Sequence, residues 1–255
     1  MENSGHGAGK QYLEAALDRL EWVLRAQHEQ IAAAGAAVAK AIAAGGWWFL
    51  FGTGHSHMLA EEAFYRAGGL KRVVPILDGS LMLHESAVQS TQIERLSGLA
   101  EILFQERGIT ERDVLLIASN SGRNAVTVEM AETAKAHGVF TIAVTSLAHS
   151  RKASSRAPSG RRLFEVADLV IDNGAPYGDA VIAVSERIGS MGPVSTITGA
   201  AIVNAIAVEA AGRLDAEGLP VDVWISANVD RTEEARADGG QPLTPEQIRL
   251  RCRHI

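Results

Sequence analysis

Apolar residues recur at two different spacings along this chain, and each spacing predicts a different kind of element. Between residues 10 and 44 they recur every three, four or seven positions, which places them on one face of a helix. The positions of this stripe are Leu13, Leu17, Leu20, Leu24, Ile31, Val38 and Ile42. We therefore expect a long N-terminal helix, whose length favours a break near Gly35. The stripe could cover the core of the same chain or pack against a partner subunit, and its pattern fits both.

After this helix the pattern changes to short, continuous apolar runs, which are typical of buried strands. The runs cover residues 47–51, 73–77, 114–118, 139–144 and 169–171. Helical patterns cover residues 58–67, 93–106, 125–137 and 196–214. Because strands and helices alternate with short turns between them, the chain is predicted to be an α/β protein. We expect a three-layer sandwich in which helices flank a five-stranded parallel sheet on both faces.

The 255 residues suffice for one large domain or two small ones. The alternating pattern predicts a single domain over residues 10–229. Residues 1–9 are polar and glycine-rich, and we expect them to be disordered. Residues 230–255 are charged and contain Gly239-Gly240 and two prolines, so we expect a tail rather than a second domain.

Composition and charge narrow the class of protein. The sequence is 47% hydrophobic and 21% charged, as in ordinary globular proteins. Its net charge of −6 argues against a nucleic-acid partner, because phosphate backbones would be repelled. The one cysteine, Cys252, excludes an intrachain disulfide and a cysteine-based metal site. Without a signal peptide or an apolar run of about 18 residues, we expect no membrane contact and a cytoplasmic location.

Two predicted strands run into loops rich in glycine and serine. The loops are Gly52-Thr-Gly-His-Ser-His57 and Ser119-Asn-Ser-Gly-Arg-Asn124, and neither contains lysine. Glycine permits tight turns, so backbone N–H groups and hydroxyls can close around an anion where a helix begins. Ser119 or Ser121 alone could be a helix cap. Because the carboxyl ends of parallel strands share one edge of a sheet, the two loops together predict a phosphate site.

Two nucleotide-binding motifs fit these loops poorly. The P-loop requires Gly-Lys followed by Ser or Thr, and the chain has no such run. The dinucleotide fingerprint requires a third glycine where His57 stands. The predicted phosphate therefore belongs to a smaller ligand.

The two loops, about 65 residues apart, resemble the phosphate loops of the SIS (sugar isomerase) domain family. Thr145-Ser146 after the next strand fits the same pattern, and the resemblance covers roughly residues 35–215. The family includes phosphoheptose isomerase, the isomerase domain of glucosamine-6-phosphate synthase and N-acetylmuramic acid 6-phosphate etherase. The resemblance implies a five-stranded parallel sheet, a homodimer with shared active sites, and a sugar-phosphate ligand without a cofactor.

The same resemblance implies which residues hold the phosphate. They are Gly54, Ser56, Ser119, Asn120, Ser121, Gly122 and Asn124, of which Asn120 and Gly122 act through the backbone. Asn124 departs from the family, because many members carry Ser or Thr there. An amide can still donate a hydrogen bond, so we retain Asn124 as a phosphate ligand.

Enzymes of this kind open the sugar ring and remove the proton next to the carbonyl, which requires a carboxylate or an imidazole. Glu85 is the strongest candidate, because the corresponding region of the etherases carries a catalytic glutamate, and His84 lies beside it. Glu186 loosely resembles the base of the synthase isomerase domain, although an insertion precedes Ser195-Thr196. Surface charge on a helix is the alternative explanation for Glu85. Glu94 has the pattern of an ordinary solvated charge, although etherases carry acidic residues in this region.

Three further residues are expected to contact the sugar. They are His55, His57 and Glu62, although a glutamate early in a helix can equally serve the helix dipole. His84 could join the two histidines in a metal site, because phosphoheptose isomerases hold zinc with histidine, glutamate and glutamine. The position that matches their helix histidine is Glu62 here, so we expect no metal.

These observations predict an enzyme that removes the proton next to the carbonyl of an amino-sugar 6-phosphate and eliminates the C3 substituent, as a dehydratase or etherase-like lyase. Aldose–ketose isomerisation is the alternative reaction. A third possibility is a non-catalytic sugar-phosphate sensor. Such regulators carry an N-terminal helix-turn-helix domain, which typically needs more than the ~45 residues before the first strand here.

Overall fold

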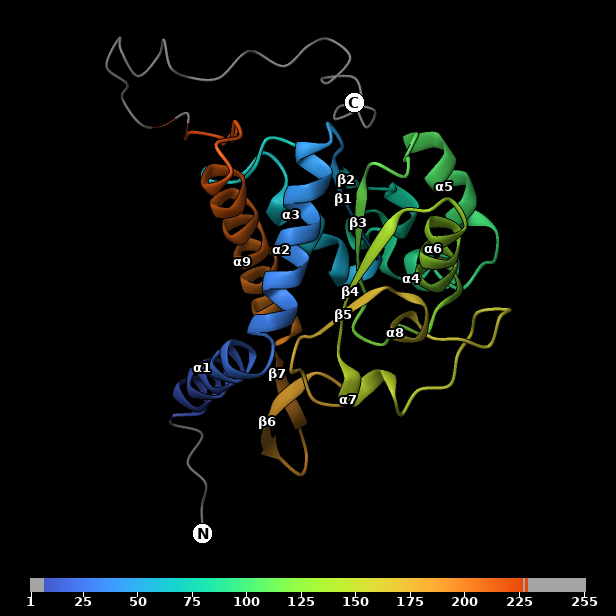
Figure 1. The fold of residues 1–255 in the computed structure, drawn as a ribbon. Helices are drawn as coiled ribbons and strands as arrows, with labels where there is room; N and C mark the ends of the chain where they lie inside the picture. The colour runs from blue at the N-terminus through green and yellow to red at the C-terminus, as the bar shows by residue number, and fades with distance from the viewer. Residues whose placement is uncertain (1–6, 227, 229–255) are drawn as a thin grey trace.

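The computed structural model describes residues 7–226 and residue 228 (Figure 1). The tail predicted over residues 230–255 and most of the N-terminal segment predicted to be disordered lie outside the described residues. The helix that follows that segment begins at Ala8.

A five-stranded parallel sheet forms the centre of the molecule, which confirms the predicted fold. The strands are β1 (Trp48–Gly52), β2 (Val73–Ile76), β3 (Val114–Ala118), β4 (Phe140–Thr145) and β5 (Leu169–Asp172). They lie in the order β2-β1-β3-β4-β5, and Trp48 pairs with Val73 on one side and Val114 on the other. Successive side chains of β1 are all buried, because both faces of the sheet are covered.

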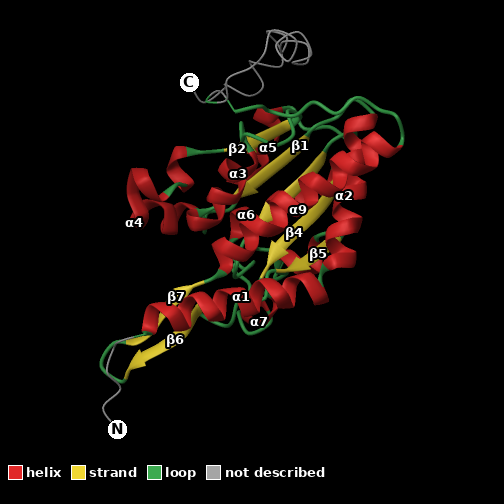
Figure 2. Cartoon of the chain, turned by 90° about the vertical axis from the view of Figure 1, so that its left-hand side faces the viewer, coloured by secondary structure: helices red, strands yellow, loops and turns green. Residues whose placement is uncertain are grey.

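Helices cover the two faces of the sheet in separate groups (Figures 1 and 2). The helices are α1 (Ala8–Ala26), α2 (His28–Ala43), α3 (Met58–Ala63), α4 (Leu83–Ile93), α5 (Leu99–Arg107), α6 (Ala125–Ala136), α7 (Leu147–Ser150), α8 (Leu163–Val166) and α9 (Ser195–Ala216). Helices α2, α3 and α9 pack on the face that carries Trp48 and Leu50. Helices α5, α6 and α8 pack on the face that carries Phe49 and Phe51. Each face thus has its own core, as the three-layer prediction requires.

The long N-terminal helix is two helices that meet at Gln27, eight residues before the expected break. The side chain of Gln27 accepts a hydrogen bond from the backbone N–H of Asp172 at the end of β5, at 3.0 Å. This bond ties the bend to the edge of the sheet, and α1 continues beyond it. Gly35 lies inside α2 and packs against Glu209 of α9, so its role is close packing and not a break.

An antiparallel hairpin that the sequence analysis did not predict projects beyond the sheet (Figures 1 and 2). It consists of β6 (Ala180–Ser185) and β7 (Gly189–Pro193). Tyr12 of α1 lies against it, because its hydroxyl donates to the carbonyl oxygen of Pro193 at 2.8 Å. Helix α1 and the hairpin therefore contact each other outside the main sheet.

Helix α9 is long and apolar enough, by length and composition, to cross a membrane. Its described contacts account for much of this apolar character, because residues spaced along one side are buried in the core formed with α2 and α3. These residues are Gly199, Ile202, Val203, Ile206, Ala210 and Leu214. The helix therefore serves as a core element of the domain.

Candidate active site

The strand order places the two glycine- and serine-rich loops side by side. The chain changes direction between β1 and β3, and in sheets of this topology ligands bind at that point. Gly52 pairs with Ala118 at the last register position, so the two loops leave the sheet at the same level. The structure thus brings together the two loops that were predicted from the sequence.

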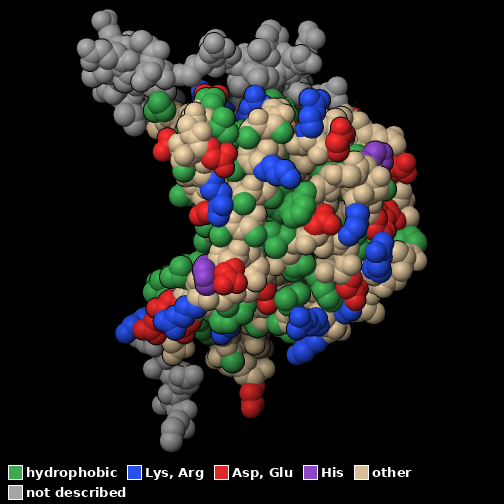
Figure 3. Space-filling view, in the orientation of Figure 1, with side chains coloured by type: hydrophobic (Ala, Val, Ile, Leu, Met, Phe, Trp, Pro, Cys, Tyr) green, Lys and Arg blue, Asp and Glu red, His purple; other side chains and the backbone are tan. Residues whose placement is uncertain are grey.

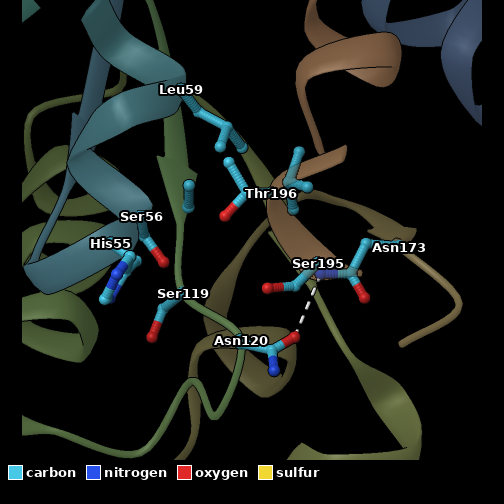
Figure 4. Close-up of a pocket in the computed structure, with 10 residues that line it drawn as sticks. His55, Ser56, Leu59, Ser119, Asn120, Asn173, Ser195 and Thr196 are labelled. Carbon is cyan, nitrogen blue, oxygen red and sulfur yellow. Dashed lines mark hydrogen bonds between the residues drawn. The ribbon is translucent and has the colours of Figure 1, made fainter. Parts of the chain in front are cut away.

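A small pocket opens between these loops and the start of α9 (Figure 4). Its lining residues are His55, Ser56, Leu59, Ala118, Ser119, Asn120, Val144, Asn173, Ser195 and Thr196. The hydroxyls of Ser56, Ser195 and Thr196 point toward one central space in Figure 4. The pocket therefore presents mainly hydroxyl and amide groups, as recognition of a polar ligand requires.

The loop that follows β3 is closed by its own first residue. The hydroxyl of Ser119 accepts a hydrogen bond from the backbone N–H of Gly122 at 3.1 Å. Gly122 has a φ of +56°, and a Cβ there would lie only 3.1 Å from Leu163 Cβ and Ser150 Oγ. Glycine is therefore required at this turn both for its conformation and for the close approach of neighbouring atoms.

Asn120 is held in the pocket by residues that follow the next two strands. Ser146 N–H and Thr145 Oγ1 donate to its carbonyl oxygen at 3.2 and 3.3 Å. The side chain of Asn173 donates to Asn120 Oδ1 at 3.1 Å, the bond drawn dashed in Figure 4. Thr145 and Ser146 are fully buried, so they support the loop from behind.

Glu94 connects the two loops. Its carboxylate accepts a hydrogen bond from Thr53 Oγ1 at 2.8 Å, and its carbonyl oxygen accepts one from Val126 N–H at 3.2 Å. Thr53 belongs to the loop after β1, whereas Val126 begins the helix after β3. The sequence pattern of Glu94 was that of an ordinary solvated charge, and the structure gives it bonds to both loops instead.

Arginines gather beside the second loop. Arg156 Nη1 donates to Asn124 Oδ1 at 3.0 Å, and Arg123 Nη2 donates to Ser154 Oγ at 2.9 Å. Partial burial, together with repulsion from Arg123 and Arg95, lowers the pKa of Arg156. This repulsion indicates an excess of positive charge next to the loop, which favours an anionic ligand.

The start of α9 is a part of the pocket that the sequence analysis did not assign. Asp179 accepts hydrogen bonds from the backbone N–H groups of Val194 and Ser195, at 3.0 and 2.9 Å, and from Ser195 Oγ at 2.6 Å. These bonds hold Ser195 and Thr196 at the pocket. A Ser-Thr pair directly before a long apolar helix is a helix-start signal that could have pointed to them.

The family of the chain follows from comparison with known sequences. A family model described as the SIS domain matches residues 11–146. The chain belongs to the SIS domain family. It is 44% identical over 224 residues to a UPF0309 protein of Geobacillus thermodenitrificans, which covers 88% of this chain and 90% of the relative.

Solved structures share the fold of this SIS domain. Phosphoheptose isomerase GmhA from Neisseria gonorrhoeae has a TM-score of 0.54 at 15% identity, over 78% of this chain and 94% of that chain. Protein c3406 of E. coli CFT073, solved in complex with a sugar phosphate, has a TM-score of 0.53 at 16% identity, over 86% of this chain and 95% of that chain. At these identities the similarity shows the fold alone.

Not all of the predicted phosphate residues of the SIS domain line the pocket. His55, Ser56, Ser119 and Asn120 do, whereas Ser121, Gly122 and Asn124 lie further along the same loop, before α6. Gly54 lies in the turn of the first loop, with a φ of +55°. The buried ring of His57 contacts the carbonyl oxygen of Gly54, and its Nε2 lies 3.4 Å from Glu61 Oε2, so His57 points into the loop.

The two residues predicted to act on the sugar lie at the rim of the site. His84 and Glu85 begin α4, with side chains 60% and 64% exposed and 3.8 Å between His84 Nε2 and Glu85 Oε1. The ring centroid of His84 lies 6.2 Å from that of His57. They therefore lie close to the first loop and are open to solvent.

Two other predicted residues lie away from the pocket of their own chain. Glu62 accepts a hydrogen bond from Asn204 Nδ2 at 2.9 Å and pairs with Arg66 at 3.1 Å, so its carboxylate faces α9. Glu186 is exposed in the turn between β6 and β7. A six-residue strand spans about 20 Å, so this turn is far from the base of the hairpin near the pocket.

The described part of the chain holds no group of three or more His, Cys, Asp or Glu side chains arranged to bind a metal ion. The expectation of no metal stays a prediction. Near the second loop, burial and the charge of Arg123 lower the pKa of His149, against a smaller opposing effect of Asp179. The backbone N–H of Gly178 donates to His149 Nδ1 at 3.4 Å.

Proposed function

We propose that this SIS domain binds an amino-sugar 6-phosphate between the loops at 53–57 and 119–124 and removes the proton next to the carbonyl of the open-chain sugar. The observation that carries the proposal is the convergence of two hydroxyl- and amide-rich loops on one pocket at the β1/β3 position. The relatives of known structure that are named as phosphoheptose isomerase, or that were solved with a bound sugar phosphate, support the same class of ligand.

The phosphate end of the substrate belongs at the second loop. Backbone N–H groups at the start of α6 favour an anion, because the partial positive charge of a helix lies at its N-terminus. Ser121 and Asn124 add side-chain donors at this position, and the arginines nearby add positive charge. The sugar then extends toward the first loop, where Ser56 and His55 meet it and where α4 begins.

The proposed chemistry is elimination at C3. A base takes the proton from C2, the electron pair forms the enolate with the carbonyl, and the C3–O bond breaks as the C2–C3 double bond forms. An acid protonates the departing oxygen, so that water or lactate leaves. We assign one of these roles to Glu85 and the other to His84, which are in contact at the rim. Glu186 could take the second role only in the site of a partner subunit.

Isomerisation is the second candidate reaction, and one observation favours it. Of the described residues that line the pocket, His55 alone carries an acid–base side chain. One base is enough to move a proton between C2 and C1, whereas elimination also needs an acid for the leaving group. The two reactions share the first proton transfer and differ in the product.

We also propose that the domain acts as a homodimer in which the partner completes the open rim. Helix α1 carries Leu13, Leu17 and Leu24 with 63%, 61% and 70% of each residue exposed. Figure 3 shows a hollow between the projecting N-terminal arm and the body above it, bordered by hydrophobic side chains. A second copy that covers these leucines would remove apolar surface from water and narrow the site.

A panel of hexosamine, hexose and heptose 6-phosphates, read by mass spectrometry and NMR, tests the function. A product lighter by water or lactate establishes elimination, and an unchanged mass with new signals establishes isomerisation. Ligand-dependent stabilisation without turnover would establish a sensor. Failure to bind any of these phosphates would overturn the proposal.

Replacement of Glu85 tests the assignment of the acid–base group. Glu85→Gln should lower kcat by about 10²–10⁴, the usual contribution of general acid–base catalysis, while the affinity for inorganic phosphate is retained. Glu101→Gln, an exposed glutamate of α5, is the matched control and should keep full turnover. Near-full turnover by Glu85→Gln would remove Glu85 from the mechanism.

A further inference from the structure

Arg156 contacts two successive residues of the second loop, although it lies more than thirty positions further along the chain. Its backbone N–H donates to the carbonyl oxygen of Arg123 at 2.8 Å. Its side-chain Nη1 donates to Asn124 Oδ1 at 3.0 Å. The segment between α7 and α8 is thereby joined to the part of the loop that precedes α6.

The bond to Asn124 decides which end of the carboxamide faces Arg156. A guanidinium group has only donors, so it can contact Oδ1 and not Nδ2. Oδ1 and Nδ2 lie on opposite sides of the same carbon, and Nδ2 therefore points away from Arg156. Asn124 is only 7% exposed, so its side chain has little freedom to turn.

Asn124 does not use this side chain to cap the helix that it precedes. It occupies the N-cap position of α6, yet no side-chain cap bond forms. Within the described part of the chain, its Nδ2 donates no hydrogen bond to protein. Two N–H donors are thus held in a fixed direction at the start of a helix, where an anion is favoured.

We infer that Arg156 is a positioning residue, which orients the amide of Asn124 so that Nδ2 donates to the substrate phosphate. The inference rests on the proposed function, because it requires a phosphate at this loop. Serine or threonine, which many similar proteins carry at this position, presents one hydroxyl that rotates freely and needs no such partner. An asparagine has two unlike ends, and only one of them suits an anion.

A direct contact between Arg156 and the phosphate is the competing explanation. Arg156 is exposed and lies near Arg123 and Arg95, whose charges already favour an anion there. Both explanations predict weaker phosphate binding when Arg156 is removed. They differ in whether the loss depends on the residue at position 124.

A double-mutant cycle separates the two explanations. The affinity for inorganic phosphate is measured by NMR titration at constant ionic strength for wild type, Arg156→Met, Asn124→Thr and the double variant. Arg156→Met should weaken binding about tenfold in the wild-type background, the loss expected for one hydrogen bond to a charged group. In the Asn124→Thr background the same substitution should change affinity less than about twofold. An equal loss in both backgrounds, or no loss in the wild type, would overturn the inference.

A second variant guards against a simple failure to fold. Asn124→Asp keeps an acceptor for Arg156 but has no N–H donors, so phosphate binding should fall at least tenfold while the melting temperature holds or rises. Arg151→Met, on the same segment, removes an exposed positive charge and should leave affinity within about twofold. Retained phosphate affinity in Asn124→Asp would contradict the role of Nδ2. If wild type binds no phosphate, the proposed function fails first and the inference with it.

Discussion

Hydroxyl groups in this site differ in what they are already bonded to, and this decides which of them can reach a ligand. Ser119 Oγ accepts a bond from its own loop, and Ser195 Oγ donates to Asp179. Ser56 points into the pocket, and Ser121 lies before α6. The hydroxyls of Ser56 and Ser121 are therefore the two whose loss should be felt by a ligand rather than by the loop.

Replacement of either hydroxyl should weaken ligand binding without affecting the fold. Ser56→Ala and Ser121→Ala each remove one donor to a charged acceptor, so sugar-phosphate affinity should fall about tenfold or more, equivalent to about 1.5–3 kcal/mol. Isothermal titration calorimetry measures the change. Ser159→Ala, in an exposed turn, is the control and should bind like wild type. Unchanged affinity in both site variants would place the phosphate elsewhere.

His149 predicts a pH dependence of stability. Burial and Arg123 lower its pKa in the folded state, whereas an unfolded histidine titrates near its ordinary value of about 6.5. Below that pH the unfolded state binds more protons, so protonation favours unfolding and stability falls as the pH drops. The decrease in free energy of unfolding from pH 7 to pH 5 should be smaller in His149→Gln than in wild type. Urea denaturation at both pH values measures it, and His28→Gln controls for removal of an imidazole. The same decrease in His149→Gln as in wild type would contradict the prediction.

At the scale of elements, the pairing of α2 with α9 determines how closely helices lie on the sheet. A Cβ at Gly35 would lie 2.4 Å from Glu209 Cγ and 3.2 Å from the backbone nitrogen of Ala210. The absence of a side chain therefore lets the two helices approach. Alanine is normally the better helix former, so this glycine is retained against its helix propensity.

Two glycine substitutions with opposite expected effects test this contact. Gly35→Ala should lower the free energy of unfolding by about 1–3 kcal/mol, the usual cost of overpacking. Gly212→Ala in α9, where a Cβ meets nothing within 4 Å, should raise it by about 0.5–1 kcal/mol. Chemical denaturation of both variants compares them directly. A stabilised Gly35→Ala would show that the helices separate without cost.

At the scale of the whole molecule, the exposed leucines of α1 predict a dimer. Leu17→Glu should convert the protein to a monomer at micromolar concentration and lower turnover, because a charge in an apolar interface is poorly solvated. Multi-angle light scattering measures the mass. Val88→Glu, a substitution of another exposed apolar residue, should leave the assembly intact. A fully active wild-type monomer would overturn the shared site. The cytoplasmic location expected from the sequence stays a prediction.

The sequence by itself determined the sheet, its five strands and the two loops that follow β1 and β3. These features depend on local patterns: a continuous apolar run is buried wherever it lies, and glycine after a strand permits only a few turns. Because the carboxyl ends of parallel strands share an edge, even the meeting of the two loops follows without coordinates.

The tertiary structure alone decided which polar groups face the pocket. The bend at Gln27 depends on Asp172, a residue 145 positions away, and the pocket positions of Asn173 and Ser195 depend on β5 and on Asp179. Glu62 turns to Asn204 for the same reason. A polar side chain points to whichever partner completes its hydrogen bonds, and partners distant in sequence become neighbours only when the chain has folded.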